Sequence, residues 1–218
     1  MLRGRSRLPL LAEISGPADG RAWALRRADF DSLREVLSRL TEQRVVAIVG
    51  EGEAPAVTAI ALAAAASAGG RSTILVDCDL AQPRLAGSVG LSASPGLHEY
   101  LRWEAEPRDV LQPVSLAGAA AGNGTAQLVC FAAGRPAAKT ETLLGLQSFA
   151  HMVAKLRGAY ELVLLLAPPV LSEPAACLAV AAQADAVVAG EVEGSDRAVG
   201  KAVRGLPVPA LGSIAVGS

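Results

Sequence analysis

Residues 44–79 read RVVAIVGEGEAPAVTAIALAAAASAGGRSTILVDCD, and the architecture of the chain follows from them. Continuous apolar runs at 45–49 and 73–77 predict two buried strands, and the alanine-rich segment at 55–68 predicts a helix between them. The acidic loop that joins the first strand to the helix contains two glycines. A strand, a glycine-containing loop, a helix and a second strand are typical of phosphate-binding loops, in which backbone N–H groups approach a phosphate at the helix N-terminus.

Strands and helices alternate along the rest of the chain as well. Such alternation predicts an α/β fold, a doubly wound and mostly parallel sheet flanked by helices. We expect residues 1–26 to form an N-terminal arm with a short edge strand at 8–14, and residues 27–218 to form a single domain. The other expected elements are a helix at 27–40, short helices near 96–102 and 107–112, a loop at 115–126, a strand at 127–131, a helix at 140–157, a strand at 161–167, a helix at 173–183, a strand at 185–190, a short helix at 195–204 and a strand at 210–216.

The composition excludes several classes of protein. The chain has 218 residues, of which 51% are hydrophobic and 19% charged, so it can bury a sizeable core. A net charge of −1 gives no support for binding nucleic acid through bulk charge. No apolar run reaches the ~18 residues that span a bilayer, so we expect no direct insertion into a membrane. Three widely spaced cysteines predict neither a disulfide framework nor a zinc site.

Seven segments follow one another in a fixed order between residues 28 and 190. They are ADFDSLREVL (28–37), VVAIVGEGEAPAVTAIALA (45–63), ILVDCDLAQPRL (74–85), GLSASPGLHEYL (90–101), RDVLQPV (108–114), FAAGRPAAKTETLLG (131–145) and YELVLLLAPPVL (160–171). Together they resemble the cytoplasmic domain of bacterial tyrosine kinases of capsule and exopolysaccharide synthesis, which are relatives of the MinD/ParA-type ATPases. The resemblance implies a P-loop NTPase fold.

The chain departs from this family at the residues that carry the chemistry. The family loop ends in glycine, lysine and then serine or threonine, and the resemblance places the lysine at Pro55 and the hydroxyl at Ala56. It places the aspartate that ends a later strand at Leu166. Only the middle acidic motif remains, as Asp77 and Asp79. The sequence therefore resembles a degenerate member of the family, with a degenerate Walker A loop.

These departures remove defined contacts with a nucleotide. The lysine neutralises the charge of the β- and γ-phosphates, and the hydroxyl ligates Mg²⁺. The strand-end aspartate holds the coordination shell of that metal ion in place. Proline also lacks the N–H that a phosphate would accept from. We therefore expect no catalytic residues, no bound metal and no nucleotide cofactor. The expected remnant of the pocket consists of Gly50, Glu51, Gly52, Glu53, Pro55, Ala56, Asp77, Asp79 and Leu166.

The carboxylates of this remnant have alternative interpretations. Glu51 or Glu53 could occupy the anion site at the helix N-terminus, where a carboxylate is stabilised. Asp77 and Asp79 could keep a contact with metal or water, but we favour a simpler role in which they cap the turn that follows their strand.

Three hypotheses for function follow from the resemblance. We favour a non-catalytic, pseudokinase-type accessory protein of exopolysaccharide or capsule synthesis, which docks on a membrane polysaccharide co-polymerase. Such a protein would be cytoplasmic and peripheral at the inner membrane through its partner. The alternatives are an active tyrosine autokinase or ATPase with a non-standard phosphate loop, and a MinD/ParA-like spatial regulator.

The first helix is the expected contact surface. Family kinases assemble into rings through a glutamate and two arginines spaced three apart, which fall here at Ala28, Asp31 and Arg34, so only the last is kept. We assign Phe30, Asp31 and Arg34 to the interface with a partner, and a homo-oligomer stays open. The tyrosine-rich tail of the kinases has no counterpart, because the only tyrosines are Tyr100 and Tyr160.

Overall fold

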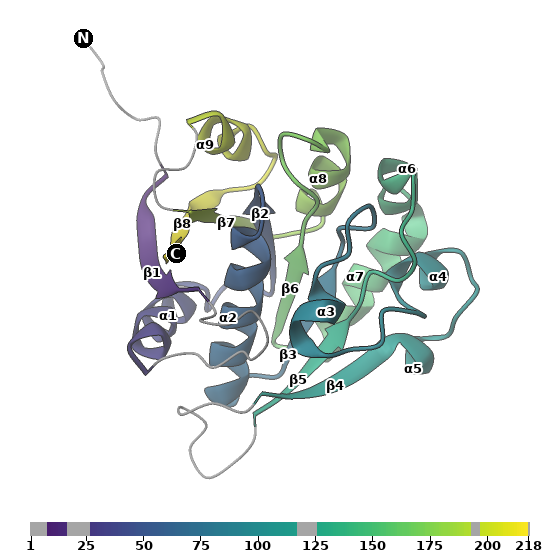
Figure 1. Cartoon of the computed structure of the whole chain (residues 1–218), viewed down its shortest axis with the longest axis horizontal. Helices are drawn as coiled ribbons and strands as arrows, with labels where there is room; N and C mark the ends of the chain where they lie inside the picture. The colour runs from purple at the N-terminus through teal and green to yellow at the C-terminus, as the bar shows by residue number, and fades with distance from the viewer. Residues whose placement is uncertain (1–7, 17–26, 117–125, 193–196, 218) are drawn as a thin grey trace.

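The computed structural model describes residues 8–16, 27–116, 126–192 and 197–217. These residues form an eight-stranded sheet with the order β1-β8-β7-β2-β6-β3-β5-β4 (Figure 1). All neighbouring strands run parallel except β4, which is antiparallel to β5. The strands are β1 (Leu10–Ser15), β2 (Val45–Gly50), β3 (Thr73–Asp77), β4 (Leu111–Leu116), β5 (Ala126–Phe131), β6 (Leu162–Leu166), β7 (Ala186–Val192) and β8 (Ala210–Gly217). The mostly parallel, doubly wound sheet expected from the sequence is confirmed.

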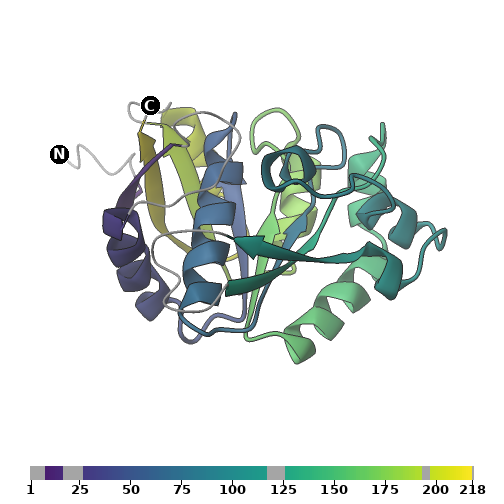
Figure 2. The same ribbon diagram turned by 60° about the horizontal axis from the view of Figure 1, so that its bottom comes forward.

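Helices cover both faces of the sheet, and each face has its own hydrophobic core. One face packs against α1 (Arg27–Arg39), α2 (Ala54–Ala68) and α3 (Leu85–Val89), with α1 beside α2 (Figure 2). The other core includes residues of α4 (Leu97–Leu101), α5 (Pro107–Val110), α6 (Thr140–Leu144), α7 (Gln147–Ala159), α8 (Pro174–Ala181) and α9 (Arg197–Arg204). Because the central strands are covered on both sides, β2, β3 and β6 are buried along their whole length.

The central helix α2 fixes the position of the loop that precedes it. Every residue from 54 to 66 is buried, so the helix has no polar face. A helix that is apolar all round is stable only where it is covered on all sides. Its many alanines have short side chains, which lets the backbone lie close to the sheet, and α2 contacts β7, β5, β2, β3, β6 and β8. The loop at 51–53 is thereby held at the carboxyl edge of the central strands.

Several boundaries differ from those expected. The helix expected at 107–112 ends at Val110, and residues 111–116 form β4, an edge strand that tolerates Pro113 because one side of it is unpaired. The first two residues of the loop expected at 115–126 belong to β4, and its last residue belongs to β5. Residues 117–125 lie outside the described residues. The helix expected at 140–157 is interrupted near Gly145 and becomes α6 and α7. The short helix expected after Asp79 is α3.

The edge strand expected at 8–14 is present as β1, one to two residues later, paired with β8. Within the described residues, no helix combines the length and the apolar composition needed to cross a membrane.

Candidate nucleotide site at the carboxyl edge of the sheet

Three segments singled out in the sequence meet at the carboxyl ends of β2, β3 and β6. Leu166 is paired in register with both Ile48 and Asp77, and its carbonyl accepts a hydrogen bond of 2.9 Å from the N–H of Cys78. The loop after β2, the turn after β3 and the loop after β6 are therefore neighbours. In open α/β sheets this edge is where ligands bind, so it is the candidate site.

The loop after β2 is packed tightly against β7. Gly50 has φ +152°, and a Cβ at this position would lie 2.5 Å from the carbonyl oxygen of Gly190. A Cβ on Gly190 would in turn lie 2.7 Å from Cα of Pro55. The first turn of α2 is buried, including Pro55 and Ala56, at the positions of the family's lysine and hydroxyl. Only glycine fits at these two contacts, and neither Pro55 nor Ala56 presents a polar side chain to a ligand.

Glu51 ties the loop to the segment after β6. Its carboxylate accepts hydrogen bonds from the backbone N–H groups of Leu171 (2.5 Å) and Ser172 (3.3 Å) and from the Ser172 hydroxyl (3.2 Å). Glu53 is the N-cap residue of α2 but makes no side-chain capping bond. The idea that one of these glutamates occupies the anion site at the N-terminus of α2 is therefore wrong, because Glu51 points elsewhere and Glu53 points outward.

Asp77 is a buried carboxylate that organises the turn after β3. Its Oδ2 accepts from the N–H groups of Arg84 and Leu85, each at 3.0 Å, and its Oδ1 accepts from the N–H of Asp79 at 3.1 Å. Burial raises the pKa of Asp77 to about 6, although these N–H groups act in the opposite direction. Both oxygens are thus committed to the backbone, as expected for a capping role.

Asp79 continues this turn. Its Oδ1 accepts a 3.0 Å hydrogen bond from the N–H of Gln82, and burial raises the pKa of its carboxyl group. Among the described residues, no group of three or more His, Cys, Asp and Glu side chains is placed to hold a metal ion. The hydrogen bonds that both aspartates accept from backbone N–H groups are those of residues that cap a turn.

Arg84 is a residue of this site that the sequence reasoning missed. Its Nη1 donates to the carbonyl of Gly52 in the loop and lies 3.5 Å from Oε1 of Glu53. Its Nε lies 3.6 Å from Oδ2 of Asp79, and the side chain is 17% exposed. A search for a cation within the loop alone could not find it, because folding brings Arg84 to the loop from the far end of the β3–α3 turn. The available signal was its place in the segment ILVDCDLAQPRL.

A pocket of about 430 Å³ lies at the same edge, between the turn after β3 and the segments that precede α6 and α8. Lys139 and Ser172 line it, together with Thr140 and Glu173, whose side chains share a 2.6 Å hydrogen bond. Its position next to Ser172 makes it continuous with the segment that holds Glu51. This pocket is lined by the turn after β3 and the segments before α6 and α8, and not by the loop after β2.

The expected interface residues on α1 differ in exposure. Asp31 and Arg34 are exposed, but Phe30 is 8% exposed and belongs to the core between α1 and the sheet. Phe30 is therefore corrected from an interface residue to a core residue. Its place in the helical apolar pattern, with Leu33 and Leu37, already indicated the buried side.

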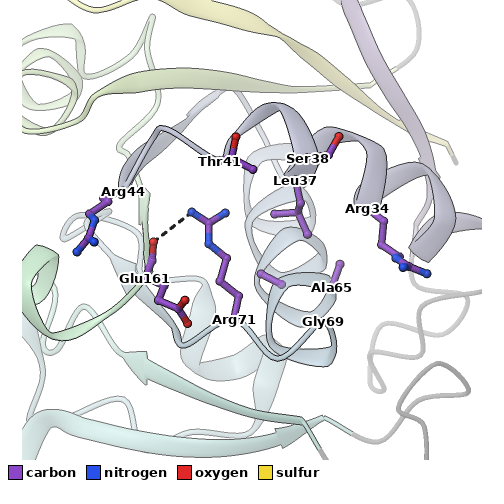
Figure 3. Close-up of a pocket in the computed structure, with 10 residues that line it drawn as sticks. Arg34, Leu37, Ser38, Thr41, Arg44, Ala65, Gly69, Arg71 and Glu161 are labelled. Atoms are coloured by element: carbon purple, nitrogen blue, oxygen red, sulfur yellow. Dashed lines mark hydrogen bonds between the residues drawn. The ribbon is translucent and has the colours of Figure 1, made fainter.

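Arg34 also lines a second pocket, of about 450 Å³, at the opposite edge of the sheet. Arg71 lies in its middle (Figure 3). Its Nη2 donates to the backbone carbonyls of Leu40, Gln43 and Glu161, of which Figure 3 draws the bond to Glu161. The guanidinium groups of Arg34 and Arg44 lie on either side and do not converge on that of Arg71 (Figure 3). This pocket is held together by arginine–carbonyl bonds, and no common anion site is formed.

No protein-family model and no curated protein matches the chain. Solved structures do resemble it. The chimerical protein CapA2B2 superposes with a TM-score of 0.80 at 17% identity, over 96% of this chain and 94% of the other. The kinase domain of the Escherichia coli tyrosine kinase ETK superposes with a TM-score of 0.78 at 17% identity, over 96% and 90%.

A third structure corrects one expectation. Cobyrinic acid a,c-diamide synthase from Mycobacterium smegmatis, with a bound ATP analogue and magnesium, superposes with a TM-score of 0.62 at 23% identity, over 79% of this chain and 74% of the other. The expectation that no cofactor belongs to this chain conflicts with such cofactor use in the fold. It rested on the missing lysine, hydroxyl and aspartate at Pro55, Ala56 and Leu166, and it left Arg84 out of account.

The residues present fit such a group in part. Arg84 supplies a guanidinium at the loop, and Asp79 a carboxylate beside it. The topology, the register at the carboxyl edge and these superpositions show that the chain has the P-loop NTPase fold of bacterial tyrosine kinase domains.

Proposed function

We propose that the chain is a non-catalytic, pseudokinase-type accessory protein of bacterial exopolysaccharide or capsule synthesis, which docks on a membrane polysaccharide co-polymerase. The observation that carries the proposal is Leu166 at the end of β6, buried in register with Asp77, in a chain that keeps the kinase fold over 96% of its length. A leucine cannot hold the shell of a catalytic metal.

The rest of the edge supports binding better than phosphoryl transfer. Phosphoryl transfer depends on positioned cations and on a residue that orients the nucleophile. Pro55 and Ala56 offer no side-chain donor, and both oxygens of Asp77 already accept from backbone N–H groups. We propose an adenine nucleotide with Mg²⁺ as the ligand of this edge, held without transfer of its phosphate. Arg84 would hold phosphate oxygens, and Asp79 is the carboxylate beside them.

The docking surface is proposed on the exposed side of α1, where Asp31 and Arg34 present charge to solvent. The protein would then be cytoplasmic and peripheral at the inner membrane through its partner. The test is affinity co-purification, in detergent, of the full chain with a two-helix membrane chain-length regulator of exopolysaccharide synthesis. Retention of the regulator with the wild-type chain, and its loss with the double variant Asp31→Lys, Arg34→Glu, would support the proposal. Failure of the wild-type chain to retain any regulator would refute it.

Phosphotyrosine distinguishes this proposal from an active autokinase. The ring of Tyr100 packs edge-on against Phe131 at a centroid distance of 5.7 Å, and Tyr160 is half-buried at the start of β6. Neither side chain is free to reach a neighbour's loop. Purified protein incubated with Mg-ATP should show no phosphotyrosine by mass spectrometry, and stoichiometric modification of either residue would favour the autokinase.

A further inference from the structure

We propose that the guanidinium of Arg84 binds the phosphates of the nucleotide and replaces, from outside the loop, the lysine that Pro55 displaces. The proposal rests on the nucleotide-binding part of the proposed function, and it is independent of docking on a co-polymerase. It concerns one side chain and one class of ligand, a nucleoside di- or triphosphate.

The position of Arg84 is fixed before any ligand binds. Its backbone N–H donates to the buried Asp77, and its carbonyl accepts from the hydroxyl of Ser88, so the start of α3 is anchored at both sides of this residue. The side chain then reaches across to the carbonyl of Gly52. Because the guanidinium is placed by the backbone of two rigid segments, it loses little freedom when a ligand arrives.

The guanidinium still has donors to offer. Arginine carries five N–H donors. Here Nη1 bonds Gly52, Nη2 lies 3.4 Å from Oε1 of Gln82, and Nε makes only a 3.6 Å ion pair with Asp79. A planar guanidinium matches a phosphate through two parallel hydrogen bonds, and a phosphate at the Nε and Nη2 edge would replace the long contacts of that edge with Asp79 and Gln82.

The charge balance around Arg84 also favours a role beyond clamping the loop. Glu51, Glu53 and Asp79 place carboxylates on or beside the loop, and a phosphate that approached without a cation would be repelled. Arg84 is the side chain whose charge contacts both the loop and the β3 turn. A ligand with bound Mg²⁺ lowers the repulsion further, so the magnesium complex is the form expected to bind.

The test is calorimetric titration of the purified full chain with Mg-ADP and with Mg-ATP. Three substitutions are compared: Arg84→Gln, Arg84→Lys and, as a matched control, Arg108→Gln, whose side chain is 80% exposed and pairs with Glu106. None of them removes a backbone N–H, so Asp77 keeps its acceptor contacts. Thermal unfolding of each variant verifies that the fold is kept.

The wild-type chain and Arg108→Gln should bind Mg-ADP with the same affinity. Arg84→Gln should bind about tenfold to a hundredfold more weakly, which is the size of a lost hydrogen bond to a charged group, and Arg84→Lys should recover most of the affinity. If the wild-type chain binds and Arg84→Gln binds equally well, Arg84 is only a loop clamp and the proposal falls. A dissociation constant of about 1 mM corresponds to a binding free energy of about −4 kcal/mol. If the wild-type chain binds no nucleotide at 1 mM, both this proposal and the nucleotide part of the proposed function are refuted.

Discussion

Asp77 makes the stability of the protein depend on pH in an unusual direction. Burial raises its pKa from the ordinary 3.8 to about 6. Between these two values the folded protein holds more protons than the unfolded chain, so the free energy of unfolding falls as the pH rises through this window. Asp77 should therefore lower stability at pH 7, relative to pH 4, by roughly 2–3 kcal/mol.

The substitution Asp77→Asn should remove this dependence. Asparagine keeps one oxygen for the N–H groups of Arg84 and Leu85 and stays neutral, so it costs about 1 kcal/mol at pH 4 through the lost bond from Asp79. Urea unfolding at several pH values from 4 to 7 should show that the free energy of unfolding of the variant rises relative to that of the wild type as the pH rises. A difference between the two proteins that is constant across this range would contradict the assignment.

Glu51 is expected to restrain the segment after β6. Glu51→Ala removes the acceptor for the N–H groups of Leu171 and Ser172. Their hydrogen exchange should then become roughly tenfold faster, which corresponds to a loss of about 1.4 kcal/mol. Glu53→Ala is the matched control, since that side chain is 83% exposed and makes only a 3.5 Å contact with Arg84. Equal protection in both variants would show that Glu51 does not restrain the segment.

At the level of elements, close backbone packing joins the start of α2 to β7. A Cβ on Gly190 would lie 2.7 Å from Cα and 2.8 Å from N of Pro55, which are backbone atoms that cannot move without shifting the helix. Gly190→Ala should lower the free energy of unfolding by about 1–3 kcal/mol. Gly87→Ala, in α3, meets nothing within 4 Å and should be neutral or slightly stabilising. Chemical denaturation of both variants measures the difference, and equal stability would show that α2 can adjust.

Most elements could be predicted because their patterns are local. The buried strands around β2, β3 and β6 are continuous apolar runs, and α2 is a long alanine-rich segment. The strand β4 could not be, since QPVS is short and polar and becomes a strand only by pairing with β5. The break between α6 and α7 was also missed, because one glycine in a helical pattern does not by itself end a helix.

At the level of the whole molecule, the position of the site could be predicted from the sequence, but the contacts within it could not. The resemblance indicated which strand ends carry the loop and the acidic turn, and parallel pairing brings them together around Leu166. The contact of Arg84 with Gly52 joins residues separated by 32 positions and leaves no periodicity in the sequence. The expectation that no cofactor belongs here failed for a related reason, because it weighed only the family's motif positions at Pro55, Ala56 and Leu166 and not the contacts that folding adds.

The pairing of β1 with β8 has a consequence for how the chain folds as it is made. Leu10 pairs with Ser213, and Ser15 with Gly217, so β1 leaves the ribosome about 200 residues before the strand that pairs with it. At synthesis rates of about 5–20 residues per second the wait is roughly 10–40 s. Throughout that time β1 is an unpaired edge that could join a strand of another chain. Glu13, exposed in the middle of β1, places a charge on that edge, and a charge on an edge strand opposes its pairing with another chain.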